Sequence, residues 1–293
     1  MKSSKLFTPV TFGPLTLRNR TIRSAAFESM CPGNVPSDML LNYHRSVAAG
    51  GIGMTTVAYA AVTQSGLSFD RQLWMRPEIV PGLRRLTDAI HAEGAAAGIQ
   101  LGHCGNMSHK SICGCTPVGA SGGFNLYSPT FVRGLRADEL PEMARAYGRS
   151  VNLAREAGFN SVEIHAGHGY LISQFLSPAT NHRKDEFGGS LENRMRFMDM
   201  VMEEVMKAAG NDMAILVKVN MRDGFRGGME IDETMQVAKR LEQSGVHALV
   251  LSGGFVSKAP MYVMRGEMPI RSMTHYMTCL LYTSDAADDL IGV

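Results

Sequence analysis

One unit recurs along this chain: a helical pattern, a glycine, and then a short strand of mostly apolar residues. Glycine directly after a helix is the usual left-handed stop at a helix C-terminus, and apolar runs are typical of strands buried on both faces. Helices that alternate with buried strands predict a parallel sheet covered by helices. The predicted helices cover residues 37–49, 79–93, 138–157, 190–209 and 231–244, and they end at Gly50, Gly94, Gly158, Gly210 and Gly245.

The number and order of these units favour a barrel. Arg20–Ala26 is predicted as the first core strand, and the strand after each helix brings the count to six by Ser252. A doubly wound sheet is the alternative, but no G-x-G-x-x-G follows the first strand. The 293 residues fit an α/β protein of the TIM (β/α)8 barrel class, with about six of the eight βα units present. V-T-F-G-P-L-T-L at residues 10–17 predicts a hairpin that forms a lid over one barrel end.

Charge and apolar content argue against several classes of protein. A formal net charge of +2, with both signs mixed along the chain, does not suit a nucleic-acid-binding surface. No apolar run approaches the roughly 20 residues of a membrane helix, and the first residues lack the apolar region of a signal peptide. The five cysteines form no disulfide framework, and Cys113-Gly-Cys115 lacks a second pair to complete a metal site. We therefore expect a cytoplasmic protein that binds no nucleic acid, membrane or metal.

The first candidate site is S-V-E-I-H-A-G-H-G-Y, residues 161–170. Apolar and polar residues alternate at its start, as in a strand, and His165, His168 and Tyr170 follow with two glycines. Because ligands of parallel α/β proteins bind at the carboxyl ends of strands, both histidines could donate hydrogen bonds to one substrate oxygen while Tyr170 delivers a proton. Structural histidines and a metal site are the alternatives, although no Asp, Glu or Cys follows at ligand spacing.

Lys218 and Gln100 are the next candidates, each within an apolar strand. Lys218 shares strand parity with Leu216 and Asn220, so it is predicted to point inward, where an unpaired ammonium is very costly. Either Glu163, which has inward parity on its own strand, pairs with Lys218, or a ligand supplies the negative charge. Gln100 ends its strand and offers a donor and acceptors that suit the edge of a heterocycle, with capping of a loop as the alternative.

The segment 102–138 is long, contains several glycines and cysteines, and shows little periodicity. A loop of this length in a compact domain is usually functional or mobile. We interpret it as an active-site cover.

Four stretches together resemble the old yellow enzyme (NADH:flavin oxidoreductase) family over about residues 5–275. They are R-N-R-T-I-R-S-A-A-F-E, I-Q-L-G-H-C-G, the run from H-A-G-H-G-Y to G-G-S-L-E-N-R, and V-K-V-N-M-R-D-G-F. The resemblance implies a TIM barrel that holds FMN at the carboxyl ends of its strands.

The resemblance also implies roles for individual residues. His165 and His168 would hold the substrate carbonyl oxygen, and Tyr170 would be the proton donor. Phe27 stands where many members have Thr or Cys near flavin O4, which puts the usual tuning of the flavin potential in doubt. The positions that would contact the flavin are Ser24, Ala25, Ala26, Ala58, Tyr59, Gln100 at the pyrimidine edge, and Lys218 beside N1.

The reaction implied by the resemblance is reduction of an electron-poor alkene. NAD(P)H would reduce FMN, and FMN would then pass hydride to Cβ of an α,β-unsaturated carbonyl while Tyr170 protonates Cα. A cation near N1 would stabilise the reduced flavin, which carries negative charge there. Two alternatives stay open: a 2,4-dienoyl-CoA reductase-like flavin and iron–sulfur enzyme, and a scaffold or inactive fragment without turnover.

The last residues depart from the family pattern. L-L-Y-T-S-D-A-A-D, within residues 278–293, resembles translated sequencing-adapter sequence, so residues 1–277 are expected to be a partial FMN-binding barrel. In the family, strands seven and eight hold the FMN phosphate, and neither is visible in the sequence. We therefore expect the chain alone to be poorly soluble and to hold little flavin, whereas a full-length parent could form a homo-oligomer.

Overall fold

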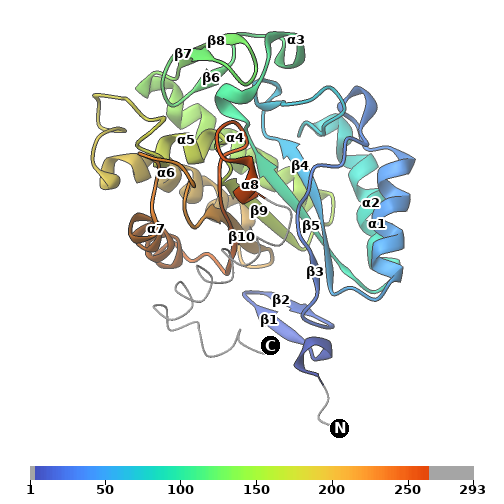
Figure 1. Cartoon of the computed structure of the whole chain (residues 1–293). Helices are drawn as coiled ribbons and strands as arrows, with labels where there is room; N and C mark the ends of the chain where they lie inside the picture. The colour runs from blue at the N-terminus through green and yellow to red at the C-terminus, as the bar shows by residue number, and fades with distance from the viewer. Residues whose placement is uncertain (1–3, 264–293) are drawn as a thin grey trace.

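A six-stranded parallel sheet forms the centre of the molecule (Figure 1). The computed structural model describes residues 4–263, so the predicted tail at 278–293 lies outside the described residues. The strands lie in the order β11-β10-β9-β5-β4-β3. Their bounds are β3 Ile22–Arg23, β4 Met54–Ala61, β5 Ala96–Gly102, β9 Ser161–Ala166, β10 Ala214–Asn220 and β11 Ala248–Ser252.

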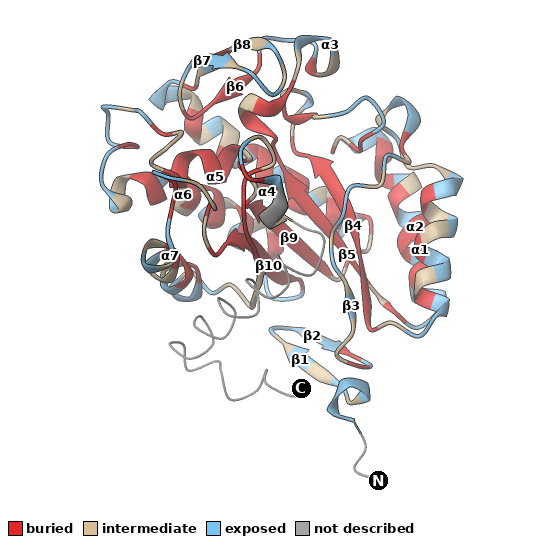
Figure 2. Ribbon diagram, viewed as in Figure 1, coloured by how far each residue is buried: buried red, intermediate tan, exposed pale blue. Residues whose placement is uncertain are grey.

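This strand order identifies the architecture. In a doubly wound sheet the strand order reverses at a switch point, whereas the parallel strands described here follow one another in sequence order across the sheet. The sheet curls, with helices packed around its outer side and buried residues along its strands (Figure 2). Strands β4, β9 and β10 are buried at every residue. The predicted α/β barrel class is confirmed, with six parallel strands in the described part of the chain.

The five predicted helices are present, each within two residues of its predicted ends. Four of the glycines that follow them have positive φ, although Gly210, with ψ −144°, lies outside the left-handed helical region. Gly50 is the exception, because it is right-handed (φ −67°) and the next residue, Gly51, is left-handed (φ +92°). The helices are α1 Asp38–Ala49, α2 Val80–Ala92, α4 Leu140–Glu156, α6 Leu191–Ala209 and α7 Ile231–Gln243, with the shorter α3 Lys110–Cys113, α5 Leu171–Leu176 and α8 Pro260–Val263.

The N-terminal hairpin forms the predicted lid. Strands β1 (Val10–Phe12) and β2 (Leu15–Leu17) pair in antiparallel fashion, and Leu17 packs with Met54 and Leu216 near the amino ends of the barrel strands. A Cβ atom on Gly13 would lie 2.4 Å from Cδ2 of His247, so only glycine fits this close approach. The hairpin therefore covers the end of the barrel opposite to the one where ligands are expected.

The first core strand is shorter than predicted. Residues 20–26 were expected to form it, but only Ile22 and Arg23 pair with β4. β3 is the edge of the described sheet, and its ladder with β4 ends at the pair Arg23–Thr55 although β4 continues to Ala61. Beyond this pair, the carbonyl oxygen of Ala25 accepts a hydrogen bond from Lys218. Ser24 and Ala26 are exposed.

The segment after β5 contains more regular structure than its sequence pattern suggested. It holds the short helices η5 (Gly105–Met107) and α3, followed by strands β6 (Val118–Gly119), β7 (Gly123–Asn125) and β8 (Thr130–Gly134). These strands form a small sheet in the order β6-β8-β7, at the top of Figure 1 above the carboxyl ends of the barrel strands. This placement agrees with a cover.

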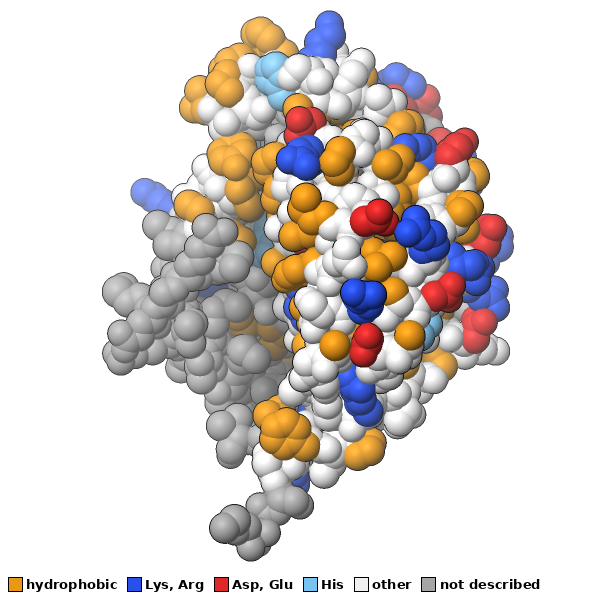
Figure 3. Space-filling view, turned by 90° about the vertical axis from the view of Figure 1, so that its right-hand side faces the viewer, with side chains coloured by type: hydrophobic (Ala, Val, Ile, Leu, Met, Phe, Trp, Pro, Cys, Tyr) orange, Lys and Arg blue, Asp and Glu red, His pale blue; other side chains and the backbone are white. Residues whose placement is uncertain are grey.

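The surface carries charges of both signs. On the face with α1 and α2, Lys and Arg side chains alternate with Asp and Glu side chains (Figure 3). Among residues 4–263, no helix combines the length and apolarity that crossing a bilayer requires.

Candidate functional site

Three polar side chains meet inside the barrel, on neighbouring strands. Gln100 of β5 stands opposite Glu163 of β9 in the ladder, and Lys218 of β10 stands opposite His165. Glu163 Oε1 accepts hydrogen bonds from Gln100 Nε2 (2.5 Å) and from Lys218 Nζ (3.0 Å). All three residues are buried, with about 4% of each exposed. Lys218 therefore points inward as predicted, and of the two possible partners the structure shows the carboxylate of Glu163.

Lys218 also contacts the segment that follows β3. Its ammonium donates to the carbonyl oxygen of Ala25 at 3.2 Å, which ties the segment after β3 to β10 across the barrel. An ammonium has three hydrogens, so one remains for a ligand after the bonds to Glu163 and Ala25.

A bulge in β4 shapes the wall beside this segment. The ladder between β4 and β5 changes register between Val57 and Ala60, so Ala58 and Tyr59 lie in the irregular part. Bulges next to active sites commonly redirect side chains. The Tyr59 hydroxyl is hydrogen-bonded to Ser68 Oγ at 2.8 Å, which fixes the ring. No sequence signal indicated this bulge.

A second buried ion cluster supports the same wall and was not predicted. Glu28 Oε1 lies 2.7 Å from Arg23 Nη1 and 3.0 Å from His44 Nε2, and the Glu28 side chain is only 3% exposed. The backbone N–H of Ala58 donates to the other carboxylate oxygen of Glu28 at 3.4 Å. Glu28 thus connects the segment that carries Ala25 and Ala26 to the β4 bulge.

His165, His168 and Tyr170 come together at the end of β9, as predicted. The ring centroids of His165 and His168 are 4.9 Å apart, and those of His165 and Tyr170 are 4.4 Å apart. Tyr59 packs against Tyr170 with a centroid distance of 5.2 Å. One compact group of two imidazoles and two phenols therefore lies above the Gln100–Glu163–Lys218 cluster.

The turn after β9 holds the second imidazole. His168 has a left-handed backbone (φ +61°), which is uncommon for a residue with a side chain, and its N–H donates to Asn220 Oδ1 at 2.8 Å. His168 Nε2 is hydrogen-bonded to Ser252 Oγ at 2.6 Å. Ser252 ends β11, as the count of six strands predicted, and the structure adds that it contacts His168.

Burial sets the protonation of this group. Desolvation, with a smaller contribution from His168, moves the pKa of His165 well below its usual value. Desolvation, with a smaller contribution from Lys218, lowers the pKa of His168 to about 3. Both imidazoles are therefore neutral at pH 7, and each carries one N–H. Gly167 N donates to His165 Nδ1 at 3.3 Å, so the proton of His165 is on Nε2. Burial raises the pKa of Tyr170, which keeps the phenol protonated.

Replacing Gly169 by alanine is expected to lower the free energy of unfolding by roughly 2–4 kcal/mol, because two costs add. Gly169 has φ +83°, and a Cβ there would lie 2.4 Å from Phe255 Cδ1. Gly189→Ala is the matched control, since Gly189 has the same φ but no atom lies within 4 Å of the place that its new methyl group would occupy. Its expected loss is about 1–2 kcal/mol. Urea unfolding followed by circular dichroism measures both, and equal losses would show that Phe255 moves aside without cost.

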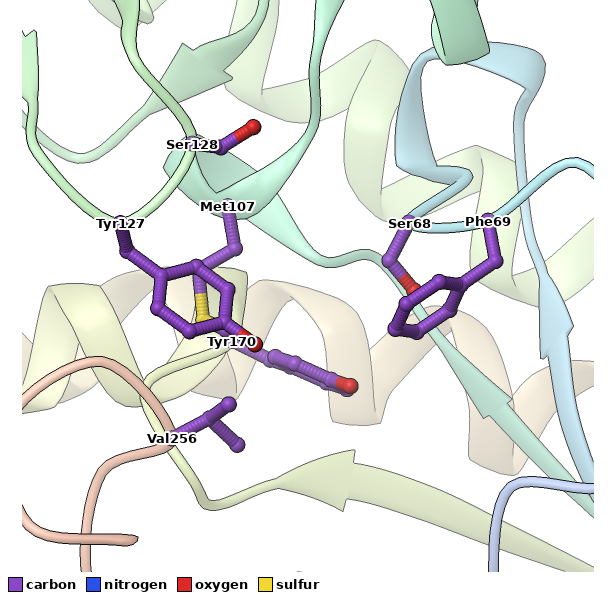
Figure 4. Close-up of a pocket in the computed structure, with 7 residues that line it drawn as sticks. All are labelled: Ser68, Phe69, Met107, Tyr127, Ser128, Tyr170 and Val256. Carbon is purple, nitrogen blue, oxygen red and sulfur yellow. The ribbon is translucent and has the colours of Figure 1, made fainter.

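A cavity of about 230 Å³ opens beside Tyr170. Figure 4 shows Tyr170 pointing into the space between the segment of Ser68 and Phe69 and the segment of Met107 and Tyr127. Phe69 stacks on Phe27, with ring centroids 4.3 Å apart. Phe27, the residue that replaces the Thr or Cys of many family members, therefore lies next to this cavity. The complete lining is Ser68, Phe69, Met107, Tyr127, Ser128, Tyr170 and Val256.

The sequence predicted only Tyr170 among these lining residues. The cover segment contributes Met107, Tyr127 and Ser128, so its predicted position over the site is correct. Within residues 4–263, no group of three His, Cys, Asp or Glu side chains is placed to hold a metal ion.

The described residues fit a flavin. Gln100 carries an amide and Lys218 keeps an ammonium hydrogen, and Lys218 contacts the backbone of Ala25. Ala26 follows Ala25, and Ala58 is joined to the same segment through Glu28, so the wall there has small side chains. Small residues next to a few polar groups suit a flat heterocycle, because the ring needs unobstructed space and directed hydrogen bonds at its edge.

Comparisons with known proteins agree with this arrangement. The chain is 41% identical over 266 residues to the 4,4'-dithiodibutanoate disulfide reductase of Rhodococcus erythropolis, a match that covers 90% of this chain and 66% of that protein. It is 36% identical to an NADPH dehydrogenase of Listeria monocytogenes, over 88% of this chain and 76% of that protein. Among solved structures, the old yellow enzyme homologue from Zymomonas mobilis superposes with a TM-score of 0.80 at 26% identity, over 93% of this chain and 79% of that one.

The match to a protein family is equally extensive. The NADH:flavin oxidoreductase / NADH oxidase family matches residues 5–293. The predicted resemblance is therefore confirmed: the chain belongs to the NADH:flavin oxidoreductase / NADH oxidase family of FMN-dependent oxidoreductases.

Proposed function

We propose that this chain reduces activated C=C bonds of α,β-unsaturated carbonyl compounds, with NAD(P)H as the reductant and FMN as the cofactor. Hydride would reach Cβ of the substrate, and Tyr170 would protonate Cα. The observation that carries the proposal is the group of His165, His168 and Tyr170 beside a cavity of about 230 Å³.

Each residue of that group has a defined task in the proposal. His165 carries its proton on Nε2, so it can donate to a carbonyl oxygen, and His168 can donate through Nδ1 when the Ser252 hydroxyl donates to its Nε2. Two neutral donors aimed at one oxygen stabilise the enolate-like charge that develops there. Tyr170 remains protonated because of its raised pKa, and it lies against His165, close to where that oxygen would bind.

The residues beneath would hold FMN. Gln100 would contact the pyrimidine edge, Lys218 would stand beside N1, and Ser24, Ala25, Ala26, Ala58 and Tyr59 would line the ring. When bound, FMN supplies the hydride chemistry that no side chain can provide. Lys218 keeps a hydrogen for this contact, and Glu163 fixes the direction of its ammonium.

A second candidate substrate is an organic disulfide. The relative at 41% identity is named for reduction of 4,4'-dithiodibutanoate, and a nicotinamide and flavin site would serve both reactions. In this alternative His165 and His168 would donate to a leaving thiolate instead of an enolate oxygen.

The test is an anaerobic assay with added FMN, NADPH and either 2-cyclohexenone or 4,4'-dithiodibutanoate, after measurement of bound flavin. Because the chain alone is expected to retain little flavin, FMN is added in excess, and the proposal expects saturable flavin binding and faster NADPH oxidation with the enone. Faster oxidation with the disulfide alone would favour the second candidate. Bound flavin without turnover of either compound would contradict both.

The remaining parts of the proposal concern the whole protein. We place it in the cytoplasm, in keeping with the four free cysteines among the described residues. We also propose that residues 1–277 form a partial barrel and that the full-length parent forms a homo-oligomer. A 2,4-dienoyl-CoA reductase-like flavin and iron–sulfur enzyme is the alternative to the enone reductase.

A further inference from the structure

Two thiols lie side by side in the cover segment, outside the site described above. Cys115 Sγ is 3.8 Å from Cys113 Sγ, the only sulfur–sulfur contact among the cysteines of residues 4–263. Cys113 is the last residue of α3 and is buried, whereas Cys115 is exposed. An accessible thiol next to a buried one suits attack on a reagent by the first, followed by resolution by the second.

The backbone between them brings the two sulfur atoms together. Gly114 is left-handed (φ +71°), and its N–H donates to the carbonyl oxygen of Lys110 to end α3. This reversal places both neighbouring side chains on one side of the chain. The sulfur atoms need to approach by less than 2 Å to reach the S–S bond length of about 2.05 Å.

From this geometry we propose that Cys113 and Cys115 form a redox-active dithiol that exchanges with small organic disulfides. The Cys115 thiolate attacks one sulfur of R–S–S–R, the reagent's S–S bond breaks, and RS⁻ leaves and takes up a proton. The Cys113 thiolate then attacks Cys115 Sγ and displaces the second RS⁻, which takes up the other proton. In sum, one reagent disulfide is reduced to two thiols, and the two protein thiols are oxidised to one disulfide.

This dithiol requires neither flavin nor nicotinamide. Along the chain, the dithiol lies between Met107, which lines the cavity, and strand β6. The helix that carries Cys113, α3, packs on the short helix η3 (Gln64–Gly66). Formation of the disulfide would fix the end of α3 relative to the chain that enters β6. In a reducing compartment such a bond is transient and suits redox sensing.

The exchange rate is expected to rise about tenfold for each pH unit between pH 7 and pH 9, because the thiolate is the attacking species. Partial burial, with a contribution from Cys113, raises the pKa of Cys115 to about 11, and Arg133 opposes this shift. The thiolate fraction therefore increases throughout this range. A rate that levels off below pH 9 would show that a different group is titrating.

The experiment incubates the whole chain, without flavin or NADPH, with bis(2-hydroxyethyl) disulfide and maps the cysteines by mass spectrometry. With Cys279→Ser present in every sample, we expect two thiols released per chain, a loss of two hydrogens in the peptide that contains Cys113 and Cys115, and unmodified Cys31 and Cys104. Cys113→Ser should retain one 2-hydroxyethylthio group on Cys115. Cys115→Ser should react at least about tenfold more slowly, because the remaining thiol is buried.

Two results would overturn the proposal. One is a disulfide that joins Cys115 to any cysteine other than Cys113. The other is a wild-type chain that keeps a mixed disulfide on Cys115 as long as Cys113→Ser does. Circular dichroism spectra of both variants that match the wild-type spectrum would exclude misfolding as the cause of their altered reactivity. We expect this match for Cys115→Ser in particular, since it changes one atom of an exposed residue.

Discussion

Tyr170→Phe is expected to slow the oxidation of reduced flavin by an enone by about 10²–10⁴-fold, the usual contribution of a positioned proton donor. Phenylalanine preserves ring packing against His165 and Tyr59, so the change removes only the hydroxyl. Burial raises the pKa of this phenol, so it is protonated across neutral and mildly alkaline pH and its loss affects the whole range. Anaerobic rapid mixing of pre-reduced protein with 2-cyclohexenone measures the rate.

The reduction of flavin by NADPH should be nearly unchanged in the same variant, because that step needs no proton from Tyr170. Tyr147→Phe is the matched control. The Tyr147 hydroxyl is buried within α4 and makes no hydrogen bond to the described residues, so its removal should leave both steps within about twofold. Unchanged enone reduction in Tyr170→Phe would assign the proton to another group.

Lys218→Met is expected to lower the free energy of unfolding by about 3–5 kcal/mol, the usual effect of removing one partner from a buried ion pair. Lys218 and Glu163 are each about 4% exposed, and the variant leaves the carboxylate of Glu163 with only the hydrogen bond from Gln100. An isolated buried carboxylate is strongly disfavoured. Denaturant unfolding of the purified variant measures the loss.

Two comparisons isolate the cause of that loss. Arg155→Met breaks an ion pair of 2.7 Å to Asp212, but both partners are about half exposed, so its expected effect is below about 1 kcal/mol. Glu163→Leu combined with Lys218→Met removes both charges and should be less destabilising than Lys218→Met alone. If the double variant is the less stable one, packing and not the charge dominates at this position.

The sequence predicted the helices and core strands well because their signals are local. Helical periodicity and a terminal glycine depend on residues a few positions apart, and α6 and α7 match their predicted ranges almost fully. The end of β3 has no such signal, because the apolar and polar pattern of residues 20–26 continues past Arg23, where the pairing with β4 stops. Strands β6 and β7 are too short to show periodicity, so their small sheet was not predicted.

In the candidate site, too, the sequence predicted what depends on neighbouring residues and missed what depends on distant segments. His165, His168 and Tyr170 share one short stretch, so their proximity could be predicted from that stretch. Phe69 and Val256, which line the same cavity, come from distant segments with no common motif. Strand parity and the cost of a buried charge left Glu163 or a ligand as the partner of Lys218, and the structure shows Glu163. The buried carboxylate of Glu28 had no such signal in the sequence.

The shared oxygen of Glu163 has a consequence for recognition. Gln100 and Lys218 already have their rotamers fixed in the protein alone, so a molecule that contacts them loses little side-chain entropy on association. The same carboxylate lies 3.0 Å from the ammonium, so an incoming anion meets a dipole and not an isolated cation. Selection at this end of the barrel therefore depends more on complementary shape and donor–acceptor pattern than on net charge.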